Sequence, residues 1–282
     1  MSSIDHFSCG LLTPTLAYMM SSVGSMLGLL LTSRARLVGG REGAFWLVGA
    51  AFAIGGTGIW TMHFIAMMGF DVHGAPIRYD VPKTVASALL AVAVVGAGLF
   101  LASHGGGRPS ALLGGGVLAG LGVAGMHYLG MAAMNMSAHV LYDPGVVALS
   151  VAIAVVAATV ALWFTVRVRG AWPIGGAALL MGVAVTGMHY TGMFAMSVEL
   201  LPGTAEVAGS RAIDFLLPLI VGISVVTVGL LLLVILSPSE KELSGEHARR
   251  AVPGERLPEP GLFASHAAGN RPRAAHEARE TP

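Results

Sequence analysis

The chain has 282 residues, of which 55% are hydrophobic and only 11% are Asp, Glu, Lys or Arg. A water-soluble domain carries about a quarter charged residues, so most of this protein's surface does not face water. A net charge of +1 offers no basic surface for nucleic acid. The single cysteine excludes an internal disulfide, a thiolate zinc site and an iron–sulfur cluster. Uncharged stretches longer than about 18 residues indicate an integral membrane protein instead.

Seven apolar segments follow one another along the chain, separated by short breaks that hold charged residues, proline or glycine. Each segment is long enough to cross about 30 Å of hydrocarbon at about 1.5 Å per residue. The predicted fold class is therefore an all-α membrane protein with seven transmembrane helices. The predicted spans are roughly residues 10–32, 44–70, 84–103, 111–136, 145–166, 173–198 and 212–236.

The basic residues in the breaks predict how the chain crosses the membrane. Breaks after the first, third and fifth spans hold six arginines, whereas the breaks on the other side hold three basic residues. By the positive-inside rule the N-terminus lies outside and the C-terminus inside. The inner residues are Arg34, Arg36, Arg41, Arg108, Arg167 and Arg169, and the outer ones are Arg78, Lys83 and Arg211.

The composition changes sharply after Leu236. Residues 237–282 hold 14 of the 31 charged side chains and are rich in Pro, Gly, Ala, Glu and Arg. Such a segment buries too little apolar area to fold alone. We therefore predict a membrane domain over residues 1–236 and a disordered cytoplasmic tail over residues 237–282.

A short motif, Met-His-aromatic-x-small-Met, recurs in the second, fourth and sixth spans. Its histidines are 64 and 62 residues apart, which is the length of two spans with their loops. This spacing predicts three helix-pair repeats plus one helix. A second repeated pattern, the pair Tyr-Asp, follows the first two motifs as Tyr79-Asp80 and Tyr142-Asp143. The three copies are Met62-His63-Phe64-Ile65-Ala66-Met67, Met126-His127-Tyr128-Leu129-Gly130-Met131 and Met188-His189-Tyr190-Thr191-Gly192-Met193.

Alternate helices run in the same direction, so the three histidines are predicted to lie at one depth, in the outer half of the bilayer. The methionine four residues after each histidine lies about 40° round the helix and shares its face. The methionine directly before each histidine lies about 100° away and reaches the site only from one edge. Met134 and Met196, seven residues after His127 and His189, are predicted to continue this row of methionines along the same helix face by a further turn. The predicted ligands are His63, His127 and His189 with Met67, Met131 and Met193, and at the edge Met62, Met126 and Met188.

An imidazole in hydrocarbon is costly unless it pairs, binds a ligand or faces water. Imidazole with thioether suits Cu(I) or Cu(II), and does not suit Mg²⁺ or Ca²⁺, which prefer oxygen. Haem with axial His or Met ligands is an alternative cofactor. A structural role is another alternative, in which the histidines are hydrogen-bonded helix contacts and the methionines fill the core. An enzyme is not expected, because no paired carboxylates or nucleophile–base set lies within the spans.

A copper transporter or assembly factor is a further alternative, for which ligands would continue to the inner face. Residues 45–59 and 112–124, in the inner halves of two motif helices, contain no His, Met, Cys or carboxylate, although Met181 lies in the third. This distribution favours a site that retains the metal. The remaining histidines, including His6 near the N-terminus and His73 and His139 in outer loops, are expected to be solvated. An alternative role for His73 and His139 is to pass a metal inward.

The three motifs resemble those of the bacterial MHYT domain family over roughly residues 10–236. The resemblance implies a seven-helix membrane sensor whose motif His and Met residues bind copper and, through it, a diatomic gas such as O2, CO or NO. Only Met188-His189-Tyr190-Thr191 is the literal tetrapeptide, because Phe64, Ile65 and Leu129 replace Tyr or Thr in the other copies. Hydroxyl groups at these positions are therefore not needed in every unit.

Many proteins of that family join the domain to a cytoplasmic cyclic-di-GMP enzyme, a kinase or a DNA-binding output. No folded segment is expected after Leu236 in this chain, so we expect it to signal through a separate cytoplasmic partner. The overall prediction is a copper-containing membrane sensor of a diatomic gas or of redox state, embedded in the lipid bilayer.

Overall fold

The structure, a computed structural model, describes residues 4–201 and 207–237. The tail predicted for residues 237–282 lies outside the described residues, apart from Ser237. Seven helices are long and apolar enough to cross a membrane, which confirms the all-α, seven-span prediction. The spans are α1 (Leu12–Val38), α2 (Gly40–Ala51) continuing through the π-helix η1 (Phe52–Thr61) into α3 (Met62–Met67), α4 (Val81–His104), α5 (Pro109–Met131), α6 (Pro144–Arg167), α7 (Ala171–Phe194) and α8 (Ala212–Leu236).

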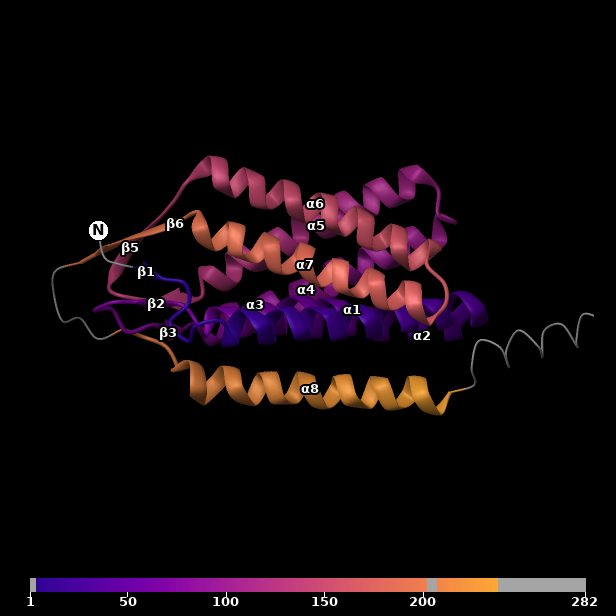
Figure 1. Cartoon of the computed structure of the whole chain (residues 1–282), viewed down its shortest axis with the longest axis horizontal. Coiled ribbons are helices and arrows are strands. Elements are labelled where there is room, and N and C mark those ends of the chain that lie inside the picture. Colours follow the sequence, from indigo (N-terminus) through magenta and orange to yellow (C-terminus); the bar gives the residue numbers. More distant parts are fainter. Residues whose placement is uncertain (1–3, 202–206, 238–282) are drawn as a thin grey trace, which may run out of the picture.

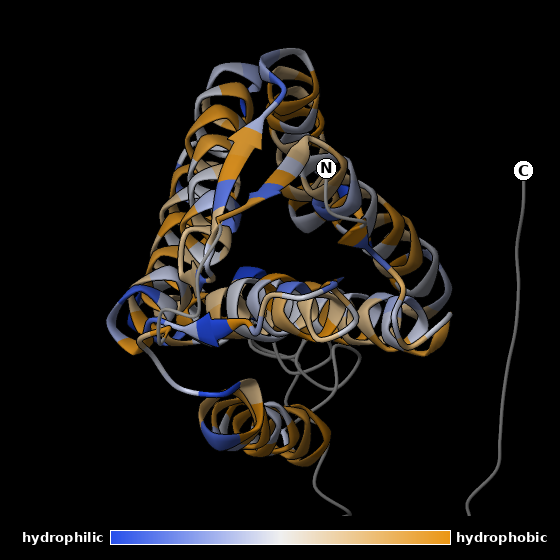
Figure 2. Cartoon of the chain, turned by 90° about the vertical axis from the view of Figure 1, so that its left-hand side faces the viewer, coloured by the Kyte–Doolittle hydropathy of each residue, from blue (hydrophilic) through white to orange (hydrophobic). Residues whose placement is uncertain are grey.

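Six of the spans form a closed ring. Going round it, α1, the α2–η1–α3 span, α4, α5, α6 and α7 each pack against the next, and α7 returns to α1. Seen along the helices, the bundle is three-sided, with α8 outside one side (Figure 2). Helix α8 contacts η1 and α1. The three motif helices are alternate members of this ring, as the repeat spacing predicted.

Short antiparallel strands gather at one end of the bundle, which we call the strand end; the opposite end is the far end (Figure 1). They form three pairs, each joining segments that are distant in sequence. The pairs are β1 (Ile4–Asp5) with β2 (Asp71–Val72), β3 (Arg78–Tyr79) with β4 (Met134–Asn135), and β5 (Ala138–Tyr142) with β6 (Met196–Leu200).

The fourth and sixth spans end earlier than the sequence suggested. Helix α5 stops at Met131 and α7 at Phe194, because the residues that follow leave the helix and pair as β4 and β6. Met134 and Met196 therefore lie in strands, and the prediction that they continue the row of methionines along the helix face is wrong. His127 consequently lies four residues, about 6 Å by helical rise, from the end of its helix.

The repeated Tyr-Asp pair lies at the starts of two helices. Asp80 caps α4 by accepting a hydrogen bond from the backbone N–H of Lys83 at 3.0 Å. Asp143 caps α6 in the same way, accepting from Gly145 at 2.8 Å and Val146 at 3.0 Å. Proline follows at the first or second helical position in both, where its missing N–H has no cost. The backbone N–H of Lys83 and then its ammonium lower the pKa of Asp80.

The first motif helix reaches its histidine through the ten-residue π-helix η1, which the sequence did not reveal. Glycines let this segment approach its neighbours closely. A Cβ added at Gly24 of α1 would meet backbone atoms of Gly58 and Ala53, and one added at Gly55 would meet the backbone of Ala91 in α4. Such close backbone approach is typical of membrane helix interfaces, where small residues replace hydrophobic driving force.

We predict that Gly24→Ala destabilises the bundle. The added methyl group meets backbone that no side-chain rotation can move, so overpacking should cost about 1–3 kcal/mol and lower the thermal midpoint of the detergent-solubilised protein. Gly114→Ala is the matched control, because a Cβ there has nothing within 4 Å. Equal midpoints for the two variants, measured by circular dichroism, would contradict the close α1–η1 contact.

Candidate metal centre

The three motif histidines meet in the interior of the bundle. His63 comes from α3, His127 from α5 and His189 from α7, and their side chains are 1%, 0% and 1% exposed. One ligand nitrogen from each lies within 4.8 Å of the others. The prediction that alternate helices bring the histidines to one depth is therefore confirmed, and we call this group the histidine triad.

The triad is organised around the Nδ1 atoms. The Nδ1 of His63 lies 2.9 Å from that of His189 and 3.2 Å from that of His127. The three rings stand edge-on to one another, with interplanar angles of 77°, 81° and 90°. Each of these Nδ1 atoms carries either a lone pair or one proton. The Nδ1 of His63 faces the Nδ1 atoms of both other rings.

Hydrogen bonding among the rings cannot satisfy this group by itself. A neutral imidazole carries one proton, so the Nδ1 of His63 either donates once or accepts once, while two other Nδ1 atoms face it. The Nε2 atoms of all three rings are also buried, with no hydrogen-bond partner among the residues that the structure describes. Buried polar groups left in this state cost about 1–3 kcal/mol each. The set is therefore more than a pair of helix-to-helix hydrogen bonds.

A single cation at the centre fits the Nδ1 set. Three nitrogens bound in one plane at about 2.0–2.1 Å from a metal are about 3.5 Å apart. The two distances from the Nδ1 of His63, 2.9 and 3.2 Å, are slightly shorter than this, and one ligand nitrogen from each ring lies within 4.8 Å of the others. Neutral imidazole suits zinc, copper, iron and nickel, so these residues could hold a transition metal without specifying which one.

The aromatic residue after each histidine orients its ring. Phe64, Tyr128 and Tyr190 each meet the preceding imidazole edge-on, with ring centroids 4.8, 4.9 and 5.0 Å apart. Tyr128 is itself fixed to α6, because its hydroxyl lies 2.6 Å from the Ser150 hydroxyl. The aromatic position of the motif thus restricts the imidazole, and Phe64 serves as well as a tyrosine because the contact needs only the ring.

The small residue three positions after the histidine makes room for the next histidine. A Cβ added at Gly130 would collide with Nε2 of His63, and one added at Gly192 would collide with Nε2 of His127. Each motif therefore supplies an imidazole. Two of the three copies also supply a glycine against which the imidazole of another motif packs. The sequence pattern showed the small residue but not its partner.

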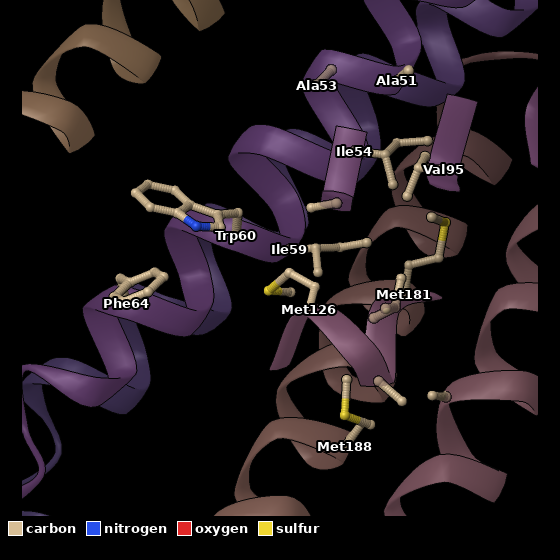
Figure 3. Close-up of a cluster of buried hydrophobic side chains, with 14 of the residues drawn as sticks. Ala51, Ala53, Ile54, Ile59, Trp60, Phe64, Val95, Met126, Met181 and Met188 are labelled. Carbon is tan, nitrogen blue, oxygen red and sulfur yellow. The ribbon is translucent and has the colours of Figure 1, made fainter. Parts of the chain in front are cut away.

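The motif methionines are all buried, and they lie on two sides of the triad. Met67, Met131 and Met193 are one helical turn toward the strand end. Met126 and Met188 point into an apolar cluster with Ile59 and Met181 toward the far end (Figure 3). Met62 packs separately, against Ala17 and Ala66. Their roles as ligands stay a prediction.

One histidine outside the motifs differs from expectation. His6 is not a solvated terminal residue, because its half-buried ring packs between Phe70 and Phe194 at the strand end. No sequence signal marked it, since it belongs to no repeat and reaches the bundle only through the β1–β2 pairing.

The arrangement of three equivalent motif helices matches a known family of repeats. The family described as bacterial signalling protein N terminal repeat matches residues 56–115, 120–177 and 182–245. The chain belongs to the MHYT family. Each matched segment begins in a motif helix, so the family repeat coincides with the structural repeat. Together with the seven spans, this makes the chain a bacterial multi-pass membrane protein.

Three curated proteins from two bacterial species are similar to this chain. It is 41% identical over 219 residues to the bifunctional diguanylate cyclase/cyclic di-GMP phosphodiesterase MucR of Pseudomonas aeruginosa, covering 75% of this chain and 31% of MucR. It is 40% identical to the cyclic di-GMP phosphodiesterase NbdA of the same species, over 56% of this chain and 21% of NbdA. It is 30% identical to the signalling protein YkoW of Bacillus subtilis, over 64% and 23% respectively.

The chain thus spans less than a third of the length of these curated relatives and corresponds to their MHYT region. No solved structure matches it.

For this MHYT triad we predict that Gly130→Ala and Gly192→Ala each weaken metal binding at least tenfold, about 1.4 kcal/mol, because the added methyl group displaces a histidine Nε2. Gly125→Ala and Gly187→Ala lie one or two turns earlier on the same helices and meet only an ordinary contact or open space. These matched controls should bind as the wild type does. Competition with a chromophoric chelator measures the affinities, and equal losses in all four variants would contradict the packing role.

Proposed function

We propose that this chain is a membrane sensor that holds a copper ion in the histidine triad and reports a diatomic gas, O2, CO or NO, or the redox state. The observation that carries the proposal is the convergence of three buried imidazoles, in which the Nδ1 of His63 lies within hydrogen-bond distance of the Nδ1 atoms of His127 and His189. Bound copper would supply an open coordination position or a change of oxidation state. The names of MucR, NbdA and YkoW support a signalling role.

Copper is preferred over other transition metals because of the sulfur atoms near the triad. Met67, Met131 and Met193 lie one turn from the histidines on the same helices, and thioethers are soft ligands that select Cu(I). Cu(II) favours more nitrogen, so the balance between imidazole and thioether would differ between the two oxidation states. His63, His127 and His189 would hold the ion in both.

A site that retains the metal fits the surroundings better than a transport path. Toward the far end the triad is followed by a cavity of about 60 Å³ with an apolar lining, which includes Ile54, Ile59, Val95, Leu99, Met181 and Met188. Two thioethers, Met181 and Met188, and the hydroxyl of Thr165 are the potential ligands in this lining, which is too few to replace the hydration shell of a cation along a path. A copper transporter would need a continuous series of ligands.

Haem is a poorer fit than a single ion. Two axial nitrogens bind haem iron from opposite faces of the macrocycle, whereas the Nδ1 atoms of His63 and His189 are only 2.9 Å apart and share their centre with a third histidine. The close contacts leave no room for a porphyrin between them.

We infer that the strand end faces the periplasm and the far end the cytoplasm. Arg34, Arg36, Arg41, Arg108, Arg167 and Arg169 all lie at or near the far-end limits of the spans, which supports this orientation by the positive-inside rule. The triad would then lie close to the periplasmic face. An output at the cytoplasmic side, through a separate signalling protein, would require the change at the triad to cross the membrane.

Helix α8 offers a route for that change. The hydroxyls of Thr57 in η1 and Thr227 in α8 lie 2.5 Å apart, and Thr57 is six residues before His63 on the same span. At the far end, Arg34 of α1 donates to the backbone carbonyls of Val234 and Ser237 at 2.7 and 3.3 Å. A change in the position of His63 would therefore be transmitted to α8 through η1. The equilibrium between two arrangements of α8 would shift by the difference in the free energy of metal binding to those arrangements.

The first experiment measures metal content by plasma mass spectrometry, with a visible spectrum, on purified protein reconstituted with Cu(I) and Cu(II). We expect a single copper ion per chain in the wild type and none in the triple variant H63A/H127A/H189A. The single substitution His127→Asn keeps a polar side chain of similar size. It tests whether metal is lost in a variant that is less prone to misfold than the triple variant. The control His104→Ala, at the exposed end of α4, should bind as the wild type does. A wild type without metal would overturn the copper proposal.

A second experiment tests the route through α8. In a background where Cys9 is replaced by serine, spin labels at Phe45→Cys and Leu236→Cys report the distance between the far ends of α2 and α8. Loading with Cu(I), which is diamagnetic, should shift this distance distribution in the wild-type sequence, and Thr227→Val should abolish the shift by removing the hydroxyl. Ser224→Ala is the control, because Ser224 bonds only to Ile220 of its own helix. A shift that survives in Thr227→Val would contradict the route.

A further inference from the structure

The N-terminal segment brings a fourth histidine to the motif helices. Strand β1 pairs with β2, just beyond the end of α3, with Ile4 opposite Val72 and Asp5 opposite Asp71. Next to this pair, the backbone N–H and the hydroxyl of Ser8 both donate to the carbonyl of Gly69 at 2.9 Å. These bonds fix the segment on both sides of His6, so its position results from the fold.

The ring of His6 lies between the ends of two motif helices. Its centroid is 5.6 Å from that of Phe70 and 4.7 Å from that of Phe194. Phe70 follows Met67 by three residues, and Phe194 directly follows Met193. His6 therefore packs against the helix ends that follow two predicted thioether ligands, Met67 and Met193.

The imidazole of His6 has the chemistry of a ligand. Its Nδ1 is buried and has no hydrogen-bond partner among the described residues. Burial lowers the pKa of His6 below its usual value, against the opposing effect of Asp5, so the ring is neutral at physiological pH and keeps a lone pair. A half-buried imidazole outside all three motifs thus lies at the ends of two motif helices.

We propose that His6 is the first ligand of a copper ion that reaches the triad from the strand end. The inference rests on the proposed function, because it needs the triad to bind copper. The triad histidines are 0–1% exposed, so an ion must lose its hydration shell before it reaches them. His6 replaces part of that shell at the surface, and Met67 and Met193 continue the path. The ion keeps its oxidation state, and its bond to His6 breaks as bonds to the triad form.

The test compares loading kinetics of the whole chain with His6→Phe. Phenylalanine keeps the contacts with Phe70 and Phe194 but has no ligand nitrogen. Cu(I) is supplied as a complex with a chromophoric chelator, and its transfer to the protein is followed by absorbance; the reverse transfer uses excess chelator. His139→Phe is the matched control, because His139 is exposed in β5 at the same end and should load at the wild-type rate.

A first ligand lowers the barrier in both directions, so His6→Phe should slow loading and release by at least tenfold each and leave the dissociation constant unchanged. Wild-type loading rates in His6→Phe would overturn the inference while the triad still binds copper. A weaker dissociation constant at an unchanged loading rate would also overturn it, since His6 would then be a resident ligand. A wild-type chain that takes up no copper would remove the proposed function and this inference together.

Discussion

The structure depends on how three buried imidazoles are held together. In the interior of a membrane protein, a polar nitrogen needs a protein group, a water molecule or a bound ion as a partner, and leaving it alone is costly. His63, His127 and His189 bring their Nδ1 atoms to one centre, where two of the distances are short enough for hydrogen bonds. Their mutual bonds satisfy them only in part, which is why the centre suits a cation so well.

The rest of the motif serves this contact. An aromatic ring follows each histidine and meets it edge-on, and a small residue three positions later, Gly130 or Gly192, receives the imidazole of a neighbouring motif. The repeated motif therefore specifies the packing between the motif helices as well as the histidine of the triad. The ring of six spans closes round this interface, and the strand pairs satisfy the backbone where α5 and α7 end.

Signalling requires an element that can move without destroying this packing. Among the described spans, α8 buries the smallest share of its side chains, and it packs outside the ring. It is tied to the first motif span by the Thr57–Thr227 contact and to α1 by Arg34. In the proposed function, the ring would hold the metal and the outer helix would carry the output, so sensing and output would lie in two parts of one domain.

The sequence by itself determined the seven spans, the three repeats and the three histidines at one depth. These follow from local rules: hydropathy sets the spans, and a constant spacing places equivalent residues at equivalent heights on helices that run in the same direction. The helix starts at Asp80 and Asp143 were equally visible as a repeated pair, although only the structure identified them as caps.

Only the tertiary structure decided which atoms meet. That Gly130 receives His63, that η1 is a π-helix, and that α5 and α7 end at Met131 and Phe194 all depend on contacts with residues distant in sequence. His6 shows the same limit most clearly. It carries no repeat, no periodicity and no hydropathy signal, and it packs against the ends of two motif helices because β1 pairs with β2. Long-range pairing of this kind leaves no trace in the local sequence pattern.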